Sequence, residues 1–124
     1  MACPNLLGMG FEAVKPHQAW VSDITYIPLK GAKWAYLAAW TDIYTRRIVG
    51  WAIDTSMTQE LIMAALSSAV RRYKPTNGLI LHSDRGGQYF GLKFKQLIDK
   101  YQFRQSMAGV KSAYENAHAE SIWA

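Results

Sequence analysis

Three of the few carboxylates in this sequence occupy unusual places, in which they could take part in metal-dependent chemistry. Asp23 lies inside an apolar segment of strand-like composition, where a buried carboxylate is costly unless something pairs with it. Asp84 directly follows a short apolar segment and precedes Arg85 and two glycines. Glu120 is expected two turns into a helix near the C-terminus, on the same helix face as Asn116.

If the chain gathers these three carboxylates at one end of a sheet, they repel one another unless cations are bound. Hard oxygen ligands favour Mg²⁺ or Mn²⁺, and two such ions activate a nucleophile and stabilise the leaving oxygen of a phosphodiester. Asp23, Asp84 and Glu120 are therefore candidate metal ligands. The alternative is that the two aspartates are turn or pairing residues and Glu120 is a solvated helix residue.

The elements that must position these residues begin with three strands. Residues 20–28 are rich in β-branched and aromatic side chains, residues 34–40 form a continuous apolar run, and residues 47–53 read RIVGWAI. Short turns separate them, with Asp42 in the second turn, so we predict an antiparallel meander. The continuous run predicts a strand covered on both faces, and Trp20, Trp34, Trp40 and Trp51 are expected in the core.

Helical periodicity follows. Apolar residues from Leu61 to Tyr73 form one stripe, with a capping-box spacing of Ser56 and Gln59 at its start and Thr58 as a competing cap. We predict a strand at 79–82, parallel to an earlier one, a helix at 91–101, an edge strand at 103–106 and a last helix from Ser112. The fold class is therefore α/β.

The length, charge and composition of the chain limit the number of domains and the classes of binding partner to be expected. The chain has 124 residues and a net charge of +5, which fits one domain. Residues 1–62 carry five basic and five acidic residues, whereas residues 63–124 carry nine basic and four acidic ones, so the whole excess lies in the second half. This predicts a polyanionic partner such as nucleic acid, or else a solvated basic surface. We expect no membrane span, and the single cysteine, Cys3, indicates a reducing, cytosolic compartment.

Four local sequences in order resemble the integrase-like catalytic core of bacterial insertion-sequence transposases, which are relatives of retroviral integrases. They are WVSDITYI at 20–27, TDIYTRRIVGW at 41–51, HSDRGGQY at 82–89 and ENAHAES at 115–121. The resemblance implies a ribonuclease H-like fold, a five-stranded mixed sheet flanked by helices. It also implies an Asp-Asp-Glu triad with thirty-five residues between the last two members, and residues 85–119 separate Asp84 from Glu120.

By this resemblance Asp23, Asp84 and Glu120 are the catalytic residues and the ligands of Mg²⁺ or Mn²⁺. The implied reaction is DNA strand cleavage and strand transfer, the implied partner is double-stranded DNA at element ends and target, and a homo-oligomer in the bacterial cytoplasm is expected. Candidate DNA contacts are Arg85, Gln88, Lys93, Lys95, Lys111 and Asn116. Alternatively, the lysines are solvated, and Gln88 with Tyr89 holds the loop against the sheet. His82 is expected to be structural rather than an acid or base.

Some features depart from the family pattern. Glu115 replaces the usual aspartate, residues 107–113 are less polar than usual, and the chain ends four residues after Glu120. The early end predicts a core at 18–124 that is truncated shortly after the third acidic residue. Residues 1–17 contain two prolines and two glycines with little periodicity, so we expect an N-terminal arm there, docked through Phe11 and Val14. The alternatives to an active transposase core are a catalytically silent remnant that keeps a nucleic-acid-binding or dimerising surface, and a general ribonuclease H-like nuclease.

Overall fold

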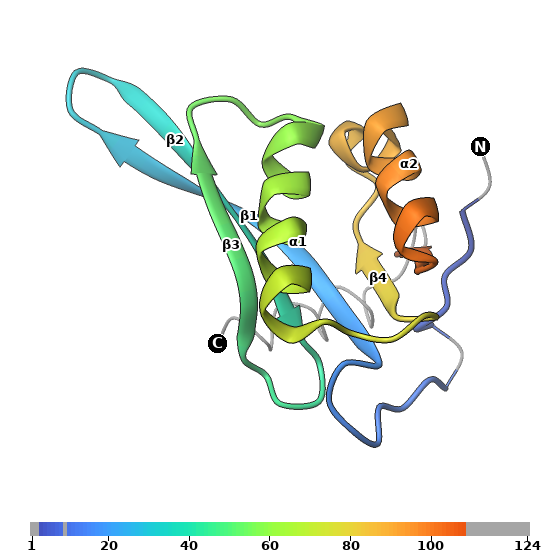
Figure 1. Ribbon diagram of the computed structural model, residues 1–124. Coiled ribbons are helices and arrows are strands. Elements are labelled where there is room, and N and C mark those ends of the chain that lie inside the picture. Colours follow the sequence, from blue (N-terminus) through green and yellow to red (C-terminus); the bar gives the residue numbers. More distant parts are fainter. Residues whose placement is uncertain (1–2, 9, 109–124) are drawn as a thin grey trace.

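The computed structural model describes residues 3–8 and 10–108. They form a mixed sheet with two α-helices on one face (Figure 1). The candidate residues Lys111, Asn116 and Glu120, and the expected helix from Ser112, lie outside the described residues. In chain order the elements are β1 (Ala19–Leu29), β2 (Lys33–Asp42), β3 (Ile48–Asp54), α1 (Gln59–Tyr73), β4 (Ile80–Ser83), the 3₁₀ turn η1 (Gly87–Phe90), α2 (Leu92–Tyr101) and β5 (Arg104–Met107).

The five strands lie in the order β3-β2-β1-β4-β5. β1, β2 and β3 are antiparallel neighbours, while β4 is parallel to both β1 and β5. Figure 1 shows α1 and α2 side by side on one face of this sheet. The predicted meander, crossover helix and parallel strand are therefore confirmed, as is the five-stranded mixed sheet.

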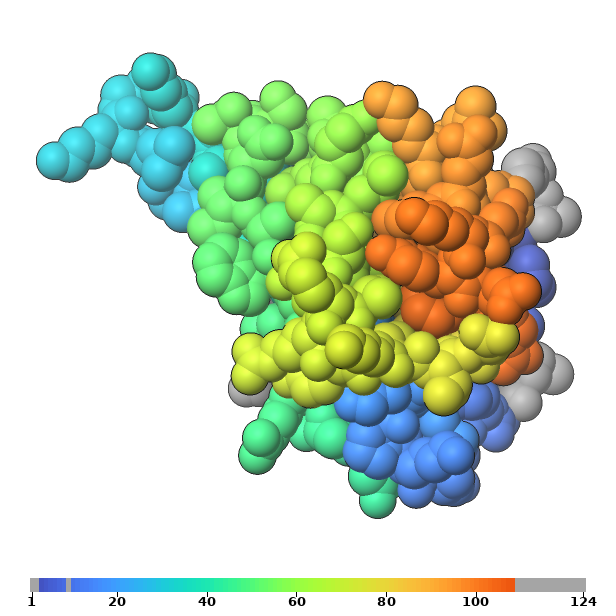
Figure 2. Space-filling model, viewed as in Figure 1, coloured from blue at the N-terminus to red at the C-terminus, as the bar shows by residue number. Residues whose placement is uncertain are grey.

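The hairpin of β1 and β2 extends well beyond the rest of the sheet, as Figures 1 and 2 show. Its two strands pair from Trp20 with Asp42 to Leu29 with Lys33, and the turn uses Gly31 at φ 76° and Ala32 at φ 58°. Because the outer half leaves the body, Trp34 is 52% exposed. The prediction that β2 is covered on both faces is therefore wrong for its first half, and Trp34 is not a core residue.

The core lies between the sheet and the two helices. Trp20 and Trp40 are fully buried there, as predicted, and the indole N–H of Trp40 donates to the main-chain oxygen of Ile62 in α1 at 3.2 Å. Trp51 was expected in the core too, but it is 58% exposed, so that prediction is wrong. The reason is the period of two along β3: Gly50 faces α1, and Trp51 points to the opposite face.

Helix α1 begins without the predicted capping box. Thr58 is the N-cap residue and makes no side-chain capping bond, while the side chain of Gln59 accepts the main-chain N–H of Phe94 at 3.0 Å. Gln59 therefore satisfies an orphan donor in the first turn of α2 instead of its own helix. Lys74 ends α1 in the left-handed conformation, one residue before the proline that was expected to stop it.

The turn between β2 and β3 is fixed by a buried carboxylate. One oxygen of Asp42 accepts the main-chain N–H of His17 at 2.8 Å, and the other accepts that of Thr45 at 2.7 Å. This agrees with the expected place of Asp42 in a turn and also attaches the N-terminal segment to the sheet.

The segment before β1 lies along the outer edge of the sheet. The oxygen of Pro4 accepts the N–H of Met107 at 3.0 Å, and the N–H of Leu6 donates to the hydroxyl of Ser106 at 2.8 Å. Phe11 is partly buried, whereas Val14 is exposed and does not dock as expected. Within the described residues, no helix is long and apolar enough to cross a membrane.

Close packing of α1 on β3 depends on Gly50. A Cβ placed there would collide with the main-chain oxygen of Ala65 and lie 2.7 Å from the Cβ of Ala69. We therefore expect Gly50→Ala to lower the free energy of unfolding by about 1–3 kcal/mol, because overpacking must displace α1. Urea unfolding measures this. Gly87→Ala is the matched control, since its added methyl would meet nothing within 4 Å; equal effects of both variants would contradict the packing argument.

Candidate active site

The parallel pairing of β1 with β4 sets two of the three predicted carboxylates next to each other in register. Val21 pairs with His82, so continuing both strands by two residues places Asp23 level with Asp84. Neighbouring strands lie about 4.8 Å apart, and residues two apart on a strand share a face. The two aspartates therefore emerge on the same face, opposite α1 and α2, at the carboxyl end of β4.

Both carboxylates are oriented by nearby main-chain N–H groups. One oxygen of Asp84 accepts the N–H of Gly86 at 2.8 Å, and one oxygen of Asp23 accepts the N–H of Ile24 at 2.9 Å. Asp84 is exposed and Asp23 is partly exposed. The site is therefore acidic and open to solvent. Glu120, the third predicted member, lies outside the described residues, and in the described part of the chain no three His, Cys, Asp or Glu side chains form a metal-binding group.

A buried tyrosine supports this pair from the helix side of the sheet. The hydroxyl of Tyr89 is 2.8 Å from that of Ser22, the residue before Asp23, and its ring meets Phe94 edge to face at 6.1 Å. Burial raises the pKa of Tyr89, and the negative charges of Asp84 and Asp23 raise it further. Tyr89 therefore stays neutral and links the loop after β4 to β1, which favours the alternative in which Gln88 and Tyr89 hold the loop against the sheet.

His82 lies in the sheet below Asp84. It is buried, and its Nδ1 is 2.8 Å from the hydroxyl of Ser106 on β5, which also accepts the N–H of Leu6. This bond connects β4, β5 and the N-terminal segment. The expected structural role of His82 fits this position.

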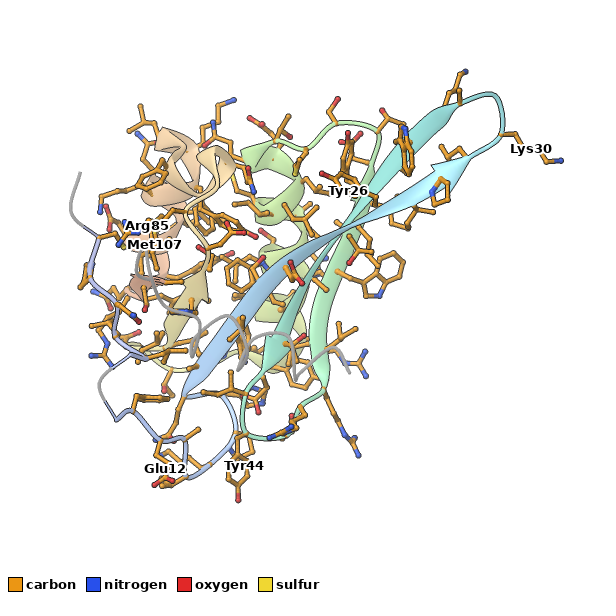
Figure 3. The ribbon with its side chains drawn as sticks, turned by 180° about the vertical axis from the view of Figure 1, so that it is seen from behind. Glu12, Tyr26, Lys30, Tyr44, Arg85 and Met107 are labelled. Atoms are coloured by element: carbon orange, nitrogen blue, oxygen red, sulfur yellow. The ribbon has the colours of Figure 1, made fainter. Side chains whose placement is uncertain are left out.

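The side chain of Arg85 faces away from the carboxylates. Its Nε donates to the main-chain oxygen of Ala108 at 2.9 Å, and one terminal nitrogen donates to that of Cys3 at 3.2 Å. Figure 3 shows Arg85 beside Met107 at the end of β5. These bonds favour a structural role over the predicted DNA contact, because the guanidinium is occupied by two carbonyl groups.

The other candidate DNA contacts are scattered. Gln88 lies beside Tyr89 and Gly86. Lys93 on α2 forms an exposed ion pair with Glu60 at 3.3 Å, and Lys95 is exposed on the same helix. Since α2 covers the face opposite the aspartates, the structure does not bring these lysines to the acidic pair.

The model of the integrase core domain family matches residues 13–113, which include β1 to β5 and both aspartates. The chain belongs to the integrase core domain family. The resemblance noted in the sequence is thereby confirmed.

Curated members of the family with similar sequences belong to bacterial insertion sequences. The chain is 41% identical over 120 residues to an uncharacterized 31 kDa protein of insertion element IS600 from Shigella sonnei, covering 97% of this chain and 44% of that protein. It is 37% identical over 119 residues to transposase InsF of IS3A from Escherichia coli, covering 96% and 41%. The chain thus spans less than half the length of these relatives.

Solved integrases share the fold of this integrase core. The simian T-cell lymphotropic virus intasome matches with a TM-score of 0.76 at 16% identity, over 97% of this chain and 41% of that one. The HTLV-2 integrase catalytic core in complex with magnesium matches with a TM-score of 0.69 at 17% identity, over 85% and 68%. At these identities the likeness establishes the ribonuclease H-like fold.

The bond between Ser22 and Tyr89 is testable by a double-mutant cycle. We expect Tyr89→Phe and Ser22→Ala each to lower the free energy of unfolding by about 1–2 kcal/mol, because each variant leaves the buried hydroxyl of the other residue without this hydrogen bond. The double variant should lose less than the sum, with a coupling of about 0.5–1.5 kcal/mol. Additive losses in urea unfolding would mean that the two hydroxyls do not interact.

The raised pKa of Tyr89 also predicts a pH dependence. A group whose pKa is higher in the folded state contributes stability below its ordinary pKa, and this contribution falls as the pH rises above it, here about 10. We expect the unfolding free energy of the wild type to fall more steeply above this pH than that of Tyr89→Phe. Parallel curves for the two proteins would refute the assignment.

Proposed function

We propose that this chain is the catalytic core of an insertion-sequence transposase, which cleaves DNA and transfers the freed strand to a target with the help of divalent metal ions. The observation that carries the proposal is the register that sets Asp23 level with Asp84 on the sheet face opposite α1 and α2, in a chain of the integrase core family. In this proposal Asp23, Asp84 and Glu120 form the catalytic triad.

The donor chemistry at the acidic pair fits a hard cation. Two carboxylates on adjacent strands supply oxygen ligands, and a main-chain N–H group orients one oxygen of each. Oxygen ligands of this kind suit Mg²⁺ or Mn²⁺. When bound, such an ion lowers the pKa of an attacking water or hydroxyl and neutralises the developing phosphate charge.

The remaining residues hold the site in place. Phosphoryl transfer depends mainly on positioning and charge, so the rigidity of the two strands matters as much as their carboxylates. Tyr89 fixes the loop after β4 from below through Ser22, and Arg85 fixes it from the side through two carbonyl groups. Gly87 leaves the outer surface of this loop open, since a Cβ there would meet nothing within 4 Å. A phosphate backbone can therefore approach the loop closely.

The proposal includes double-stranded DNA as the substrate and an oligomer as the active form. Support for the oligomer comes from the HTLV-2 integrase core, which was solved in a trimeric and in a dimeric form. The basic excess of residues 63–124 favours a polyanionic substrate.

The direct test is strand transfer of a labelled duplex end into plasmid DNA with Mn²⁺. We expect Asp84→Asn and Asp23→Asn to lower the transfer rate by about 10²–10³-fold or more, because each removes a charged ligand from the site. Asp99→Asn, an exposed carboxylate on α2, is the matched control and should keep the wild-type rate. Transfer that persists in Asp84→Asn would overturn the assignment of the triad.

A second readout is independent of activity. Mn²⁺ should broaden the NMR amide signals around Asp23 and Asp84 in the wild type, and much less in Asp84→Asn. If broadening occurs there but the wild type transfers no strands, the chain is a silent remnant that keeps its metal site. If the signals around the two aspartates do not broaden, the metal assignment fails.

A further inference from the structure

The projecting hairpin carries an exposed cluster of three aromatic side chains, which the proposed chemistry does not use. Tyr26 pairs with Tyr36 across the strands, and Trp34 lies opposite Pro28, so all three aromatic side chains share one face of the hairpin. The rings of Tyr26 and Trp34 are 5.9 Å apart, and those of Tyr26 and Tyr36 are 5.5 Å apart. We call Tyr26, Trp34 and Tyr36 the hairpin aromatic cluster.

The cluster is exposed to solvent and lines a shallow pocket. Tyr26 is 62% exposed and Trp34 is 52% exposed, although large aromatic side chains are usually buried. The three rings line an open hollow of about 260 Å³. This lies just below the range of pockets for drug-sized ligands, about 300–1,000 Å³, and so suits one planar ring system better than a large molecule.

The hairpin that carries the cluster is basic in sequence. Residues 24–41 contain Lys30 and Lys33 and no carboxylate. Figure 3 shows Lys30 at the tip of the hairpin and Tyr26 further back along it. The nearest carboxylate in register is Asp54, opposite Tyr36 on β3, and its side chain accepts the N–H of Thr55. Lys30 lies in the turn at the tip, whereas Lys33, next to Trp34, lies on the opposite face of the hairpin because successive side chains of a strand alternate. Exposed aromatic rings beside a basic turn match a polyanion that also offers flat faces for stacking.

We propose that the hairpin aromatic cluster binds unpaired bases of a DNA strand, with Lys30 at the tip contacting its phosphates. Aromatic side chains stack on bases only where the bases are not already stacked in a duplex, which favours a single-stranded segment. The choice of DNA rests on the proposed function, because strand cleavage and transfer expose unpaired ends.

This surface is separate from the acidic pair. The cluster lies on the face of β1 that also carries Trp20 and Ser22, whereas Asp23 is on the other face. Asp23 and Tyr26 are three residues apart, or about 10 Å along the strand. A bound strand at the cluster therefore adds a second contact near the site and does not replace the contacts at the carboxylates.

The test measures binding of a labelled single-stranded oligodeoxythymidylate by fluorescence anisotropy, in EDTA so that no chemistry occurs. Stacking contributes about 1–3 kcal/mol per base, so Trp34→Ala and Tyr26→Ala should each weaken binding by about 5- to 160-fold. Lys30→Gln should lower the slope of log affinity against log salt by about 0.7, the value for one phosphate contact on a single strand, whereas Lys33→Gln on the opposite face should leave the slope unchanged.

Tyr44→Ala is the matched control, because Tyr44 is also 50% exposed and lies in the turn beside Arg46 and Arg47, at the other end of β2. It should bind as the wild type does. Circular dichroism and urea unfolding should show all variants folded, since the substituted side chains are exposed. Wild-type affinity in Trp34→Ala and Tyr26→Ala would overturn the proposal.

A second copy of the chain is the competing occupant. If Trp34→Ala lowers the mass in sedimentation while oligonucleotide affinity stays unchanged, the cluster is a contact between copies and the proposal is wrong. The proposed function fails independently: Asp84→Asn should bind the oligonucleotide normally while transferring no strands. If the wild type binds the oligonucleotide through the hairpin but transfers no strands, the proposed strand-transfer activity is refuted and the proposed binding surface is not.

Discussion

The parallel pairing of β1 with β4 joins the first half of the chain to the second, and both the sheet and the acidic pair depend on it. It is short, from Ala19 with Ile80 to Val21 with His82. A parallel pair requires a long crossover, which α1 supplies. A shift of the register by one residue would send Asp84 to the helix-covered face, away from Asp23. The location of the site is therefore a consequence of this one alignment.

Packing between α1 and the sheet keeps that alignment fixed. Gly50, Ala65 and Ala69 bring the backbones of β3 and α1 close together, and Trp40 bonds to α1 through Ile62. Beyond α1 no helix in the described part of the chain covers the sheet in this way, and there the hairpin leaves the body with Tyr26 and Trp34 exposed. The same two strands thus serve as a rigid frame near the acidic pair and as an arm farther out.

Much of this organisation could be predicted from the sequence, because the strands and α1 have strong local patterns. The patterns could not show how far along each strand the helices cover the sheet. An apolar run such as residues 34–40 has the same composition whether a helix lies over it or not, so Trp34 was wrongly placed in the core. Gln59 matched a cap for its own helix but bonds across to α2, a partner that spacing along the chain cannot reveal. The acidic pair was predictable from residue type and strand order, whereas the occupied guanidinium of Arg85 required tertiary structure.

The segment along β5 has a consequence for solubility. An edge strand exposes unpaired main-chain groups that other chains can extend into a larger sheet. Here Pro4 and Leu6 lie against β5 by bonding to Met107 and Ser106, and Arg85 secures the segment through Cys3. These contacts cover the edge of β5 and thereby oppose pairing with the edge of another chain. Because Arg85 follows Asp84 directly, loss of the contacts between the N-terminal segment and Arg85 would also loosen the loop that carries a candidate catalytic carboxylate.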